Sequence, residues 1–145
     1  MSIQYTTPSK DSVEFLTSRP WYTNRHNELN IILNNIAPDS HIVAPNDIIE
    51  LNLDFSKCEF FSSNVNPLKI IKMQDSLCHD NCEKLYKLGI ISEVYTGYAL
   101  STDGLWRFHS WGFDNEEILI ETTKPRLFYY GMDYFTLVNI DNNLT

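Results

Sequence analysis

Residues 91–123, ISEVYTGYALSTDGLWRFHSWGFDNEEILIETT, decide the fold class of this chain. Segments rich in β-branched and aromatic residues alternate there with short runs of turn-forming residues, which is the pattern of successive strands. Because the connections are short, neighbouring strands should run antiparallel. We therefore expect an antiparallel meander, with strands at 91–100, 105–112 and 116–123 and two further candidates at 126–131 and 134–140.

The chain before this stretch has the pattern of helices. Residues 9–16 and 23–38 carry apolar side chains at helical spacing behind polar residues that can begin a helix. Residues 75–89 (DSLCHDNCEKLYKLG) form a third candidate, with Asp75 or Ser76 as its N-terminal cap. Helices packed on one antiparallel sheet make an α+β fold.

Length and composition fit one α+β domain over residues 1–145. A chain of 145 residues can bury one hydrophobic core but is short for two. We divide it into a helical half at 1–73, a helix plus antiparallel sheet at 74–140, and a frayed tail at 141–145. Within the helical half, residues 41–45 are a candidate short strand.

Charge and composition exclude several classes of partner. The net charge is −8, so the chain has no basic footprint for nucleic acid or anionic lipid. No apolar run approaches the length of a membrane span, and the N-terminus lacks the pattern of a secretory signal. Three cysteines favour a reducing compartment over a disulfide framework. We expect a cytoplasmic protein, with export by a signal-independent route left open.

Residues 78–82, CHDNC, first suggest a metal or redox site. Cys78 and Cys82 share a helical face, but His79 points elsewhere on the helix. A structural zinc site needs four converging ligands, and no second closely spaced pair exists, since the other histidines stand alone at positions 26, 41 and 109. A dithiol redox motif has two intervening residues, whereas this one has three. We therefore expect neither a metal nor another cofactor.

Cys78 is instead a candidate nucleophile. It would lie in the first turn of its helix, where free N–H groups and the positive end of the helix dipole stabilise a thiolate. Cys82 lies a turn further in, where this effect fades, and is expected to be a small core residue. His79 is expected to be solvated.

His109 is the candidate base. If the hairpin after it centres on Asn115, His109 lies directly opposite Glu121 on the same face of the sheet, where a carboxylate can hold one imidazole nitrogen. A hairpin centred between Asp114 and Asn115 would place Ile120 there instead. On spacing alone, a strand histidine is more often an ordinary surface or core residue than a base, Glu121 fits a solvated strand position, and Cys78 fits an inert thiol.

The order of a helix-borne cysteine, a strand histidine and a carboxylate on the next strand resembles the papain-like thiol hydrolase superfamily, including its transglutaminase-like branch. More narrowly, residues 74–131 resemble a group of small uncharacterised bacterial proteins. The shared motifs are a Cys-x-x-Asn helix start, GYAL, GLWRxHSWG, ETT, and a closing YYG or YFG.

This resemblance implies a papain-like fold and thioester chemistry. Cys78 would be the nucleophile, His109 the base and Glu121 the acid that orients it, a position where the family usually has Asp or Asn. The substrate would be an amide in a protein or peptide-like molecule. Peptide hydrolysis, amide hydrolysis, deamidation and transglutamination all fit such a site.

Three further residues are candidates for contact with the substrate. Gln74 is the nearest match to the oxyanion-hole glutamine of papain-like enzymes, although it stands closer to the cysteine than expected. Asn81 would be a structural or substrate-facing polar group, and Trp111 would line a groove, although aromatic strand residues are by default core. The alternative function is a non-catalytic protein-interaction module on the same fold.

Overall fold

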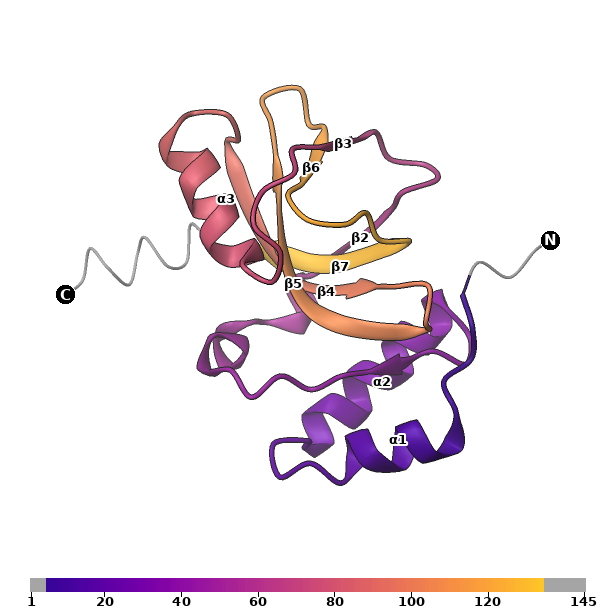
Figure 1. Cartoon of the computed structure of the whole chain (residues 1–145). Coiled ribbons are helices and arrows are strands. Elements are labelled where there is room, and N and C mark those ends of the chain that lie inside the picture. Colours follow the sequence, from indigo (N-terminus) through magenta and orange to yellow (C-terminus); the bar gives the residue numbers. More distant parts are fainter. Residues whose placement is uncertain (1–4, 135–145) are drawn as a thin grey trace.

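The computed structural model describes residues 5–134, which contain three α-helices and a curled, mixed sheet, so the fold is α+β (Figure 1). The elements in chain order are α1 (Lys10–Thr17), α2 (Asn24–Ile36), β1 (His41–Ile42), η1 (Ile48–Asn52), η2 (Phe55–Lys57), β2 (Glu59–Ser62), β3 (Leu68–Ile70), α3 (Cys78–Lys87), β4 (Glu93–Leu100), β5 (Leu105–Phe113), β6 (Leu119–Glu121) and β7 (Phe128–Asp133).

The helices begin where local chemistry favours it. The Ser9 hydroxyl accepts the N–H of Ser12 at 3.1 Å and caps α1. At the start of α2, Thr23 and His26 form a reciprocal capping box, so that two free N–H groups of the first turn find acceptors. No helix within residues 5–134 combines the length and apolar character that crossing a membrane requires.

The sheet is not the purely antiparallel meander that the sequence predicts. Its strand order is β2-β7-β4-β5-β6-β3, and β1 pairs with β5. The β4–β5 and β5–β6 pairs are antiparallel as expected, but β7 returns to β4 instead of following β6. Strands β1 and β3 pair in parallel with β5 and β6.

The division into a helical half and a sheet half is therefore wrong in part. Strands β1, β2 and β3 all come from residues 1–73, and they have only two to four residues each. Strands this short have too few residues to show a periodicity, so the sequence predicts only one of them, at residues 41–45. The predicted strand at 134–140, from residue 135 on, and the tail at 141–145 lie outside the described residues.

The register of the β5–β6 hairpin differs from both predicted alternatives. Gly112 pairs with Ile120 and Phe113 with Leu119, which centres the hairpin on residue 116. The Asp114 carboxylate stabilises this turn by accepting the N–H groups of residues 116 and 118 at 2.9 and 3.0 Å. Relative to the predicted His109–Glu121 pairing, the register is shifted by two residues. A shift of two keeps every side chain on its face of the sheet, so Glu121 still shares a face with the histidine.

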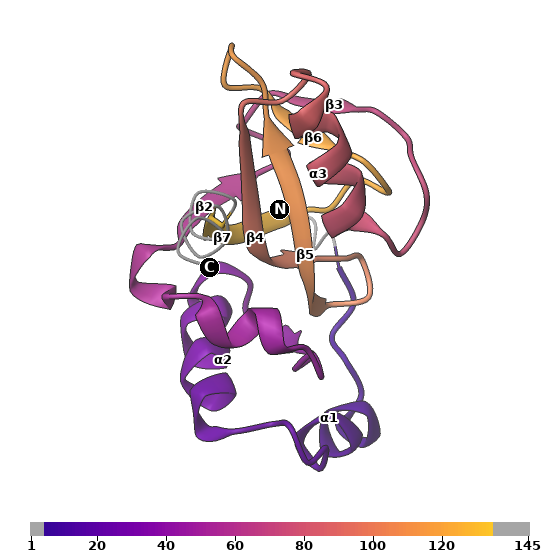
Figure 2. The ribbon, with the colours of Figure 1, turned by 90° about the vertical axis from the view of Figure 1, so that its left-hand side faces the viewer.

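One edge of β5 is covered at both ends and open between them. Strand β4 pairs with β5 along residues 106–113, so β1 and β6 must both lie on the opposite edge. There β1 pairs with residues 105 and 106, and β6 with residues 112 and 113. In the described part of the chain no strand pairs with the edge between these two contacts. The N-terminal end of α3 approaches this region (Figure 2).

Three clusters of buried side chains hold the layers together. One joins α2 to the neighbouring ends of β4 and β5, a second joins α3 to β4 and β6, and a third fills the inside of the curled sheet. Figure 1 shows α3 against one side of the sheet, with α1 and α2 beyond its end. The third cluster consists of Ala99, Trp111, Phe113, Leu119 and Tyr129.

The close approach of β4 and β7 gives a test of the sheet. Gly97 pairs with His109 on one side and Gly131 on the other, and a Cβ at Gly97 would overlap the carbonyl oxygen of Tyr130. Because that obstacle is backbone, Gly97→Ala should lower the free energy of unfolding by about 3 kcal/mol.

The control is Gly89→Ala, where nothing lies within 4 Å of the new Cβ and only the positive φ of +75° opposes it. Its cost should be about 1 kcal/mol. Urea unfolding followed by circular dichroism measures both variants, and equal losses would contradict the packing described here.

Candidate active site

Helix α3 begins at Cys78 without a side-chain cap. Leu77 occupies the N-cap position, and its side chain offers no hydrogen bond to the first turn. The predicted cap at Asp75 or Ser76 is wrong, because the Asp75 carboxylate pairs with Lys72 and Ser76 adopts a positive φ of 65°. The N–H groups of the first turn therefore lack the side-chain acceptor that most helices provide.

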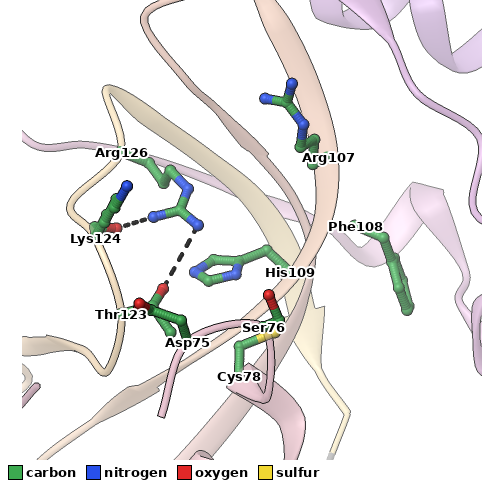
Figure 3. Close-up of a pocket in the computed structure, with 9 residues that line it drawn as sticks. All are labelled: Asp75, Ser76, Cys78, Arg107, Phe108, His109, Thr123, Lys124 and Arg126. Atoms are coloured by element: carbon green, nitrogen blue, oxygen red, sulfur yellow. Dashed lines mark hydrogen bonds between the residues drawn. The ribbon is translucent and has the colours of Figure 1, made fainter. Parts of the chain in front are cut away.

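The Cys78 thiol meets His109 at the open edge of β5 (Figure 3). The imidazole of His109 and the backbone N–H of Ser110 both lie close enough to the thiol to lower its pKa. That N–H is available because β6 pairs with β5 only at residues 112 and 113. The gap in strand pairing is thus what allows a helix terminus to contact the middle of a strand.

Electrostatics favour the charged forms of both groups. Burial opposes ionisation of Cys78, but the hydrogen bond and positive charge of His109 outweigh it and lower the pKa of the thiol. Burial likewise opposes protonation of His109, but its contacts with Cys78 and Glu121 raise the pKa of the imidazole. Both shifts favour the charged forms of the two groups, a thiolate and an imidazolium.

Glu121 holds the other side of the imidazole. Nε2 of His109 lies 2.9 Å from Oε1 and 3.1 Å from Oε2 of Glu121, and both side chains are buried. Oε1 also accepts the Tyr129 hydroxyl at 2.8 Å, and Oε2 accepts the N–H of Thr123 at 3.0 Å. Burial opposes ionisation of Glu121, but His109, Thr123 and Tyr129 together lower its pKa to about 2.

Trp111 supports the site from inside the sheet. Its ring lies 6.2 Å from that of His109 in a stacked arrangement and 5.0 Å from that of Tyr129. The side chain is fully buried, with no exposed surface. The structure therefore places Trp111 in the core beneath the histidine and not in a groove facing a substrate.

Asn81 is also a buried residue. Its Nδ2 donates to the backbone carbonyl of Gln74 at 2.8 Å and to the hydroxyl of Thr122 at 3.2 Å. These bonds tie the segment before α3 to the segment after β6, so Asn81 acts as a structural clamp. The Gln74 residue is exposed and does not line the pocket beside Cys78, which leaves its predicted oxyanion role without support from the geometry.

The sequence predicts a solvated His79, but in the structure this side chain is largely buried. Its Nδ1 is hydrogen-bonded to the hydroxyl of Ser110, which also lies 2.6 Å from the hydroxyl of Thr96. Burial lowers the pKa of His79, so the neutral form is favoured. The strand pattern could have indicated this contact. Alternation along β5 places Ser110 on the face opposite His109, and α3 covers that face.

Cys78, His79 and Cys82 do not converge on one point. Cys82 is fully buried among Leu85, Ile120 and their neighbours, as expected for a core residue, and burial raises the pKa of its thiol. Among residues 5–134, no three His, Cys, Asp or Glu side chains group in the way a metal site requires.

A pocket of about 410 Å³ opens beside Cys78 and His109. Sequence reasoning missed most of its lining. The signal available was the position of Lys124 and Arg126 within five residues of Glu121, on the loop after β6. The lining residues are Asp75, Ser76, Cys78, Arg107, Phe108, His109, Thr123, Lys124 and Arg126.

Comparisons with protein-family models, with curated proteins and with solved structures find no match to this chain. Evidence for function therefore comes from the chemistry of the site itself. That chemistry is a thiol with a lowered pKa and an imidazole with a raised pKa, both in the wall of one pocket, and a buried carboxylate behind the imidazole.

The buried carboxylate predicts a specific acid dependence of stability. A folded pKa of about 2, against an ordinary value of 4.5, means that Glu121 contributes stability above pH 4.5 and loses it as pH falls toward 2. A shift of this size corresponds to roughly 3 kcal/mol. Glu121→Gln should remove this contribution, so the variant loses less stability than the wild type between pH 5 and pH 3.

Urea unfolding at several pH values measures this difference. Glu116→Gln is the matched control, because Glu116 is an exposed turn residue whose side chain does not contact His109. The idea fails if Glu121→Gln and wild type lose stability in parallel on acidification.

Proposed function

We propose that this chain is a papain-like cysteine hydrolase or acyltransferase that acts on an amide bond of a protein or peptide-like substrate. One observation carries the proposal: Cys78 and His109 line the same pocket, His109 lowers the pKa of the thiol, and the buried carboxylate of Glu121 binds the imidazole. The order of these residues also resembles the papain-like superfamily, including its transglutaminase-like branch.

Bond formation begins at the sulfur. His109 takes the proton of Cys78, and the resulting thiolate attacks the amide carbonyl. The backbone N–H of Cys78, at the start of an uncapped helix, donates to the oxyanion. The C–N bond then breaks, and the amine takes the proton from His109 as it leaves. The product of this half-reaction is a thioester on Cys78.

The second half-reaction regenerates the thiolate. His109, now neutral, accepts a proton from water or from a second amine as that nucleophile attacks the thioester carbonyl. Water gives hydrolysis, or deamidation when the amide is a side-chain carboxamide, and an amine gives acyl transfer. The C–S bond breaks, the thiolate returns, and the proton stays on His109.

Glu121 acts through His109 as a positioning residue. Its two oxygens accept hydrogen bonds from Tyr129 and Thr123, and these bonds hold the carboxylate in place independently of the histidine. Contact with Nε2 leaves Nδ1 as the ring nitrogen available to the thiol. Glutamate is longer than the Asp or Asn of the family, and its fixed rotamer keeps the negative charge at the required place.

Thiol reactivity distinguishes this enzyme from a non-catalytic interaction module. An ordinary thiol is only about 0.3% ionised at pH 6. Burial raises the pKa of Cys58 to about 12 and also raises that of Cys82, whereas the pKa of Cys78 is lowered. Iodoacetamide at pH 6 should therefore modify Cys78 far faster than the other two cysteines, as measured by peptide mass spectrometry over time.

His109→Gln should move the pH at which Cys78 becomes reactive upward, into or beyond the ordinary thiol range. The reason is that burial then acts on the thiolate without the opposing imidazolium. Uniformly slow labelling of all three cysteines at pH 6 would favour the interaction module over the enzyme.

Turnover can be sought without knowing the substrate. A proteome-derived peptide library incubated with the protein and hydroxylamine should yield Cys78-dependent products, because hydroxylamine intercepts a thioester to give a hydroxamate. New peptide termini indicate hydrolysis, and Gln-to-Glu conversion indicates deamidation. Cys78→Ala should abolish every such product, while Cys58→Ala, which changes a thiol outside the pocket, should retain them. Equal product formation by Cys78→Ala would end the proposal.

A further inference from the structure

The pocket has the opposite charge to the chain around it. The sequence contains 19 acidic and 11 basic residues, for a net charge of −8. The pocket nevertheless has three basic side chains in its wall, from Arg107, Lys124 and Arg126, against the single carboxylate of Asp75. That carboxylate is already paired with Lys72. The space beside the thiol is thus cationic in an otherwise anionic molecule.

The three basic side chains make different contacts. Arg107 forms two contacts with Asp103, at 2.6 and 3.2 Å, and is thereby neutralised. The guanidinium of Arg126 donates to the carbonyl of Lys124 and lies 3.5 Å from the hydroxyl of Thr123. Lys124 is exposed, and within the described residues its ammonium has no ion-pair partner. In the part of the chain that the structure describes, no ion pair therefore compensates the positive charge of Lys124 at the pocket.

The loop that carries Lys124 is held in place on both sides. Thr123 donates through its N–H and its hydroxyl to Glu121, at 3.0 and 3.1 Å. Arg126 binds the Lys124 carbonyl, and its own backbone N–H donates to the Tyr129 hydroxyl at 3.0 Å. Figure 3 shows Thr123, Lys124 and Arg126 together on one side of His109. The same carboxylate that orients the histidine thus anchors the loop bearing the free cation.

We propose that the substrate is an acidic peptide, with a carboxylate close to the amide that Cys78 attacks. Lys124 pairs with that carboxylate, whereas Arg126, whose guanidinium lies 3.9 Å from Oε1 of Glu121, fixes the loop. This inference rests on the proposed function, since it names the substrate class of the same site. A cationic patch is needed because the net negative charge of the chain repels an anionic substrate elsewhere on its surface.

The test compares two alkylating agents of nearly equal size at Cys78. Iodoacetate carries a carboxylate beside the reacting carbon, and iodoacetamide is its neutral counterpart. Both react with the same thiolate, so the ratio of their rate constants isolates the response of the pocket to negative charge. We expect Lys124→Glu to lower the iodoacetate-to-iodoacetamide ratio by about threefold or more.

Lys84→Glu is the matched control, because Lys84 is exposed on α3, makes the same change in net charge and does not line the pocket. Its ratio should equal that of the wild type. Added salt should lower the wild-type ratio, and Lys124→Gln should lower it less than Lys124→Glu does. The salt series keeps the test valid if a variant fails to fold.

The outcomes separate the two proposals. Slow reaction of Cys78 with both reagents would overturn the proposed function. Fast reaction with both, with ratios that are equal in Lys124→Glu and Lys84→Glu and independent of salt, would overturn the acidic-peptide inference alone. Matched peptides then identify the source of the carboxylate, by comparing Glu with Gln in the chain and a free with an amidated C-terminus.

Discussion

The contact between His109 and Glu121 is the interaction on which the rest of the site depends. A carboxylate with no exposed surface is costly to bury unless it is paired, and here the imidazole supplies the charge partner. The carboxylate also accepts hydrogen bonds from the Tyr129 hydroxyl and the Thr123 N–H. These bonds join β7 and the loop after β6 to β5. Removing Glu121 would therefore disturb the charge of the histidine and the backbone around it together.

The second constraint is the incomplete pairing of β5. Strands β1 and β6 share one of its edges and leave a segment between them without a strand partner in the described chain. The N-terminus of α3 reaches that segment, where the Ser110 N–H and His109 lower the pKa of the Cys78 thiol. A meander with β6 paired along its whole length would satisfy that N–H within the sheet, and the thiol would lose this donor.

Much of the local structure was predictable, because helix and strand periodicities are local properties. All three α-helices and the β4–β5 hairpin lie within a few residues of their predicted positions. The contact of His109 with Glu121 was also predicted, although the register was wrong, because a shift of two residues preserves the face. Strands β1, β2 and β3 are too short to show a periodicity in the sequence. The pairing of β7 with β4 joins strands that are not consecutive in the chain, and turn residues do not predict such a pairing.

The sequence by itself determined which chemical groups are present, their order, and the face of the strand on which His109 and Glu121 lie, since alternation with a period of two follows from backbone geometry. Only the tertiary structure decided which groups meet. It brought His79 to Ser110, buried Trp111 beneath the histidine, turned Asn81 into a clamp and gathered the cations at the pocket. These contacts join segments distant in the chain, and their partners are set by how helices and strands pack, which no local pattern specifies.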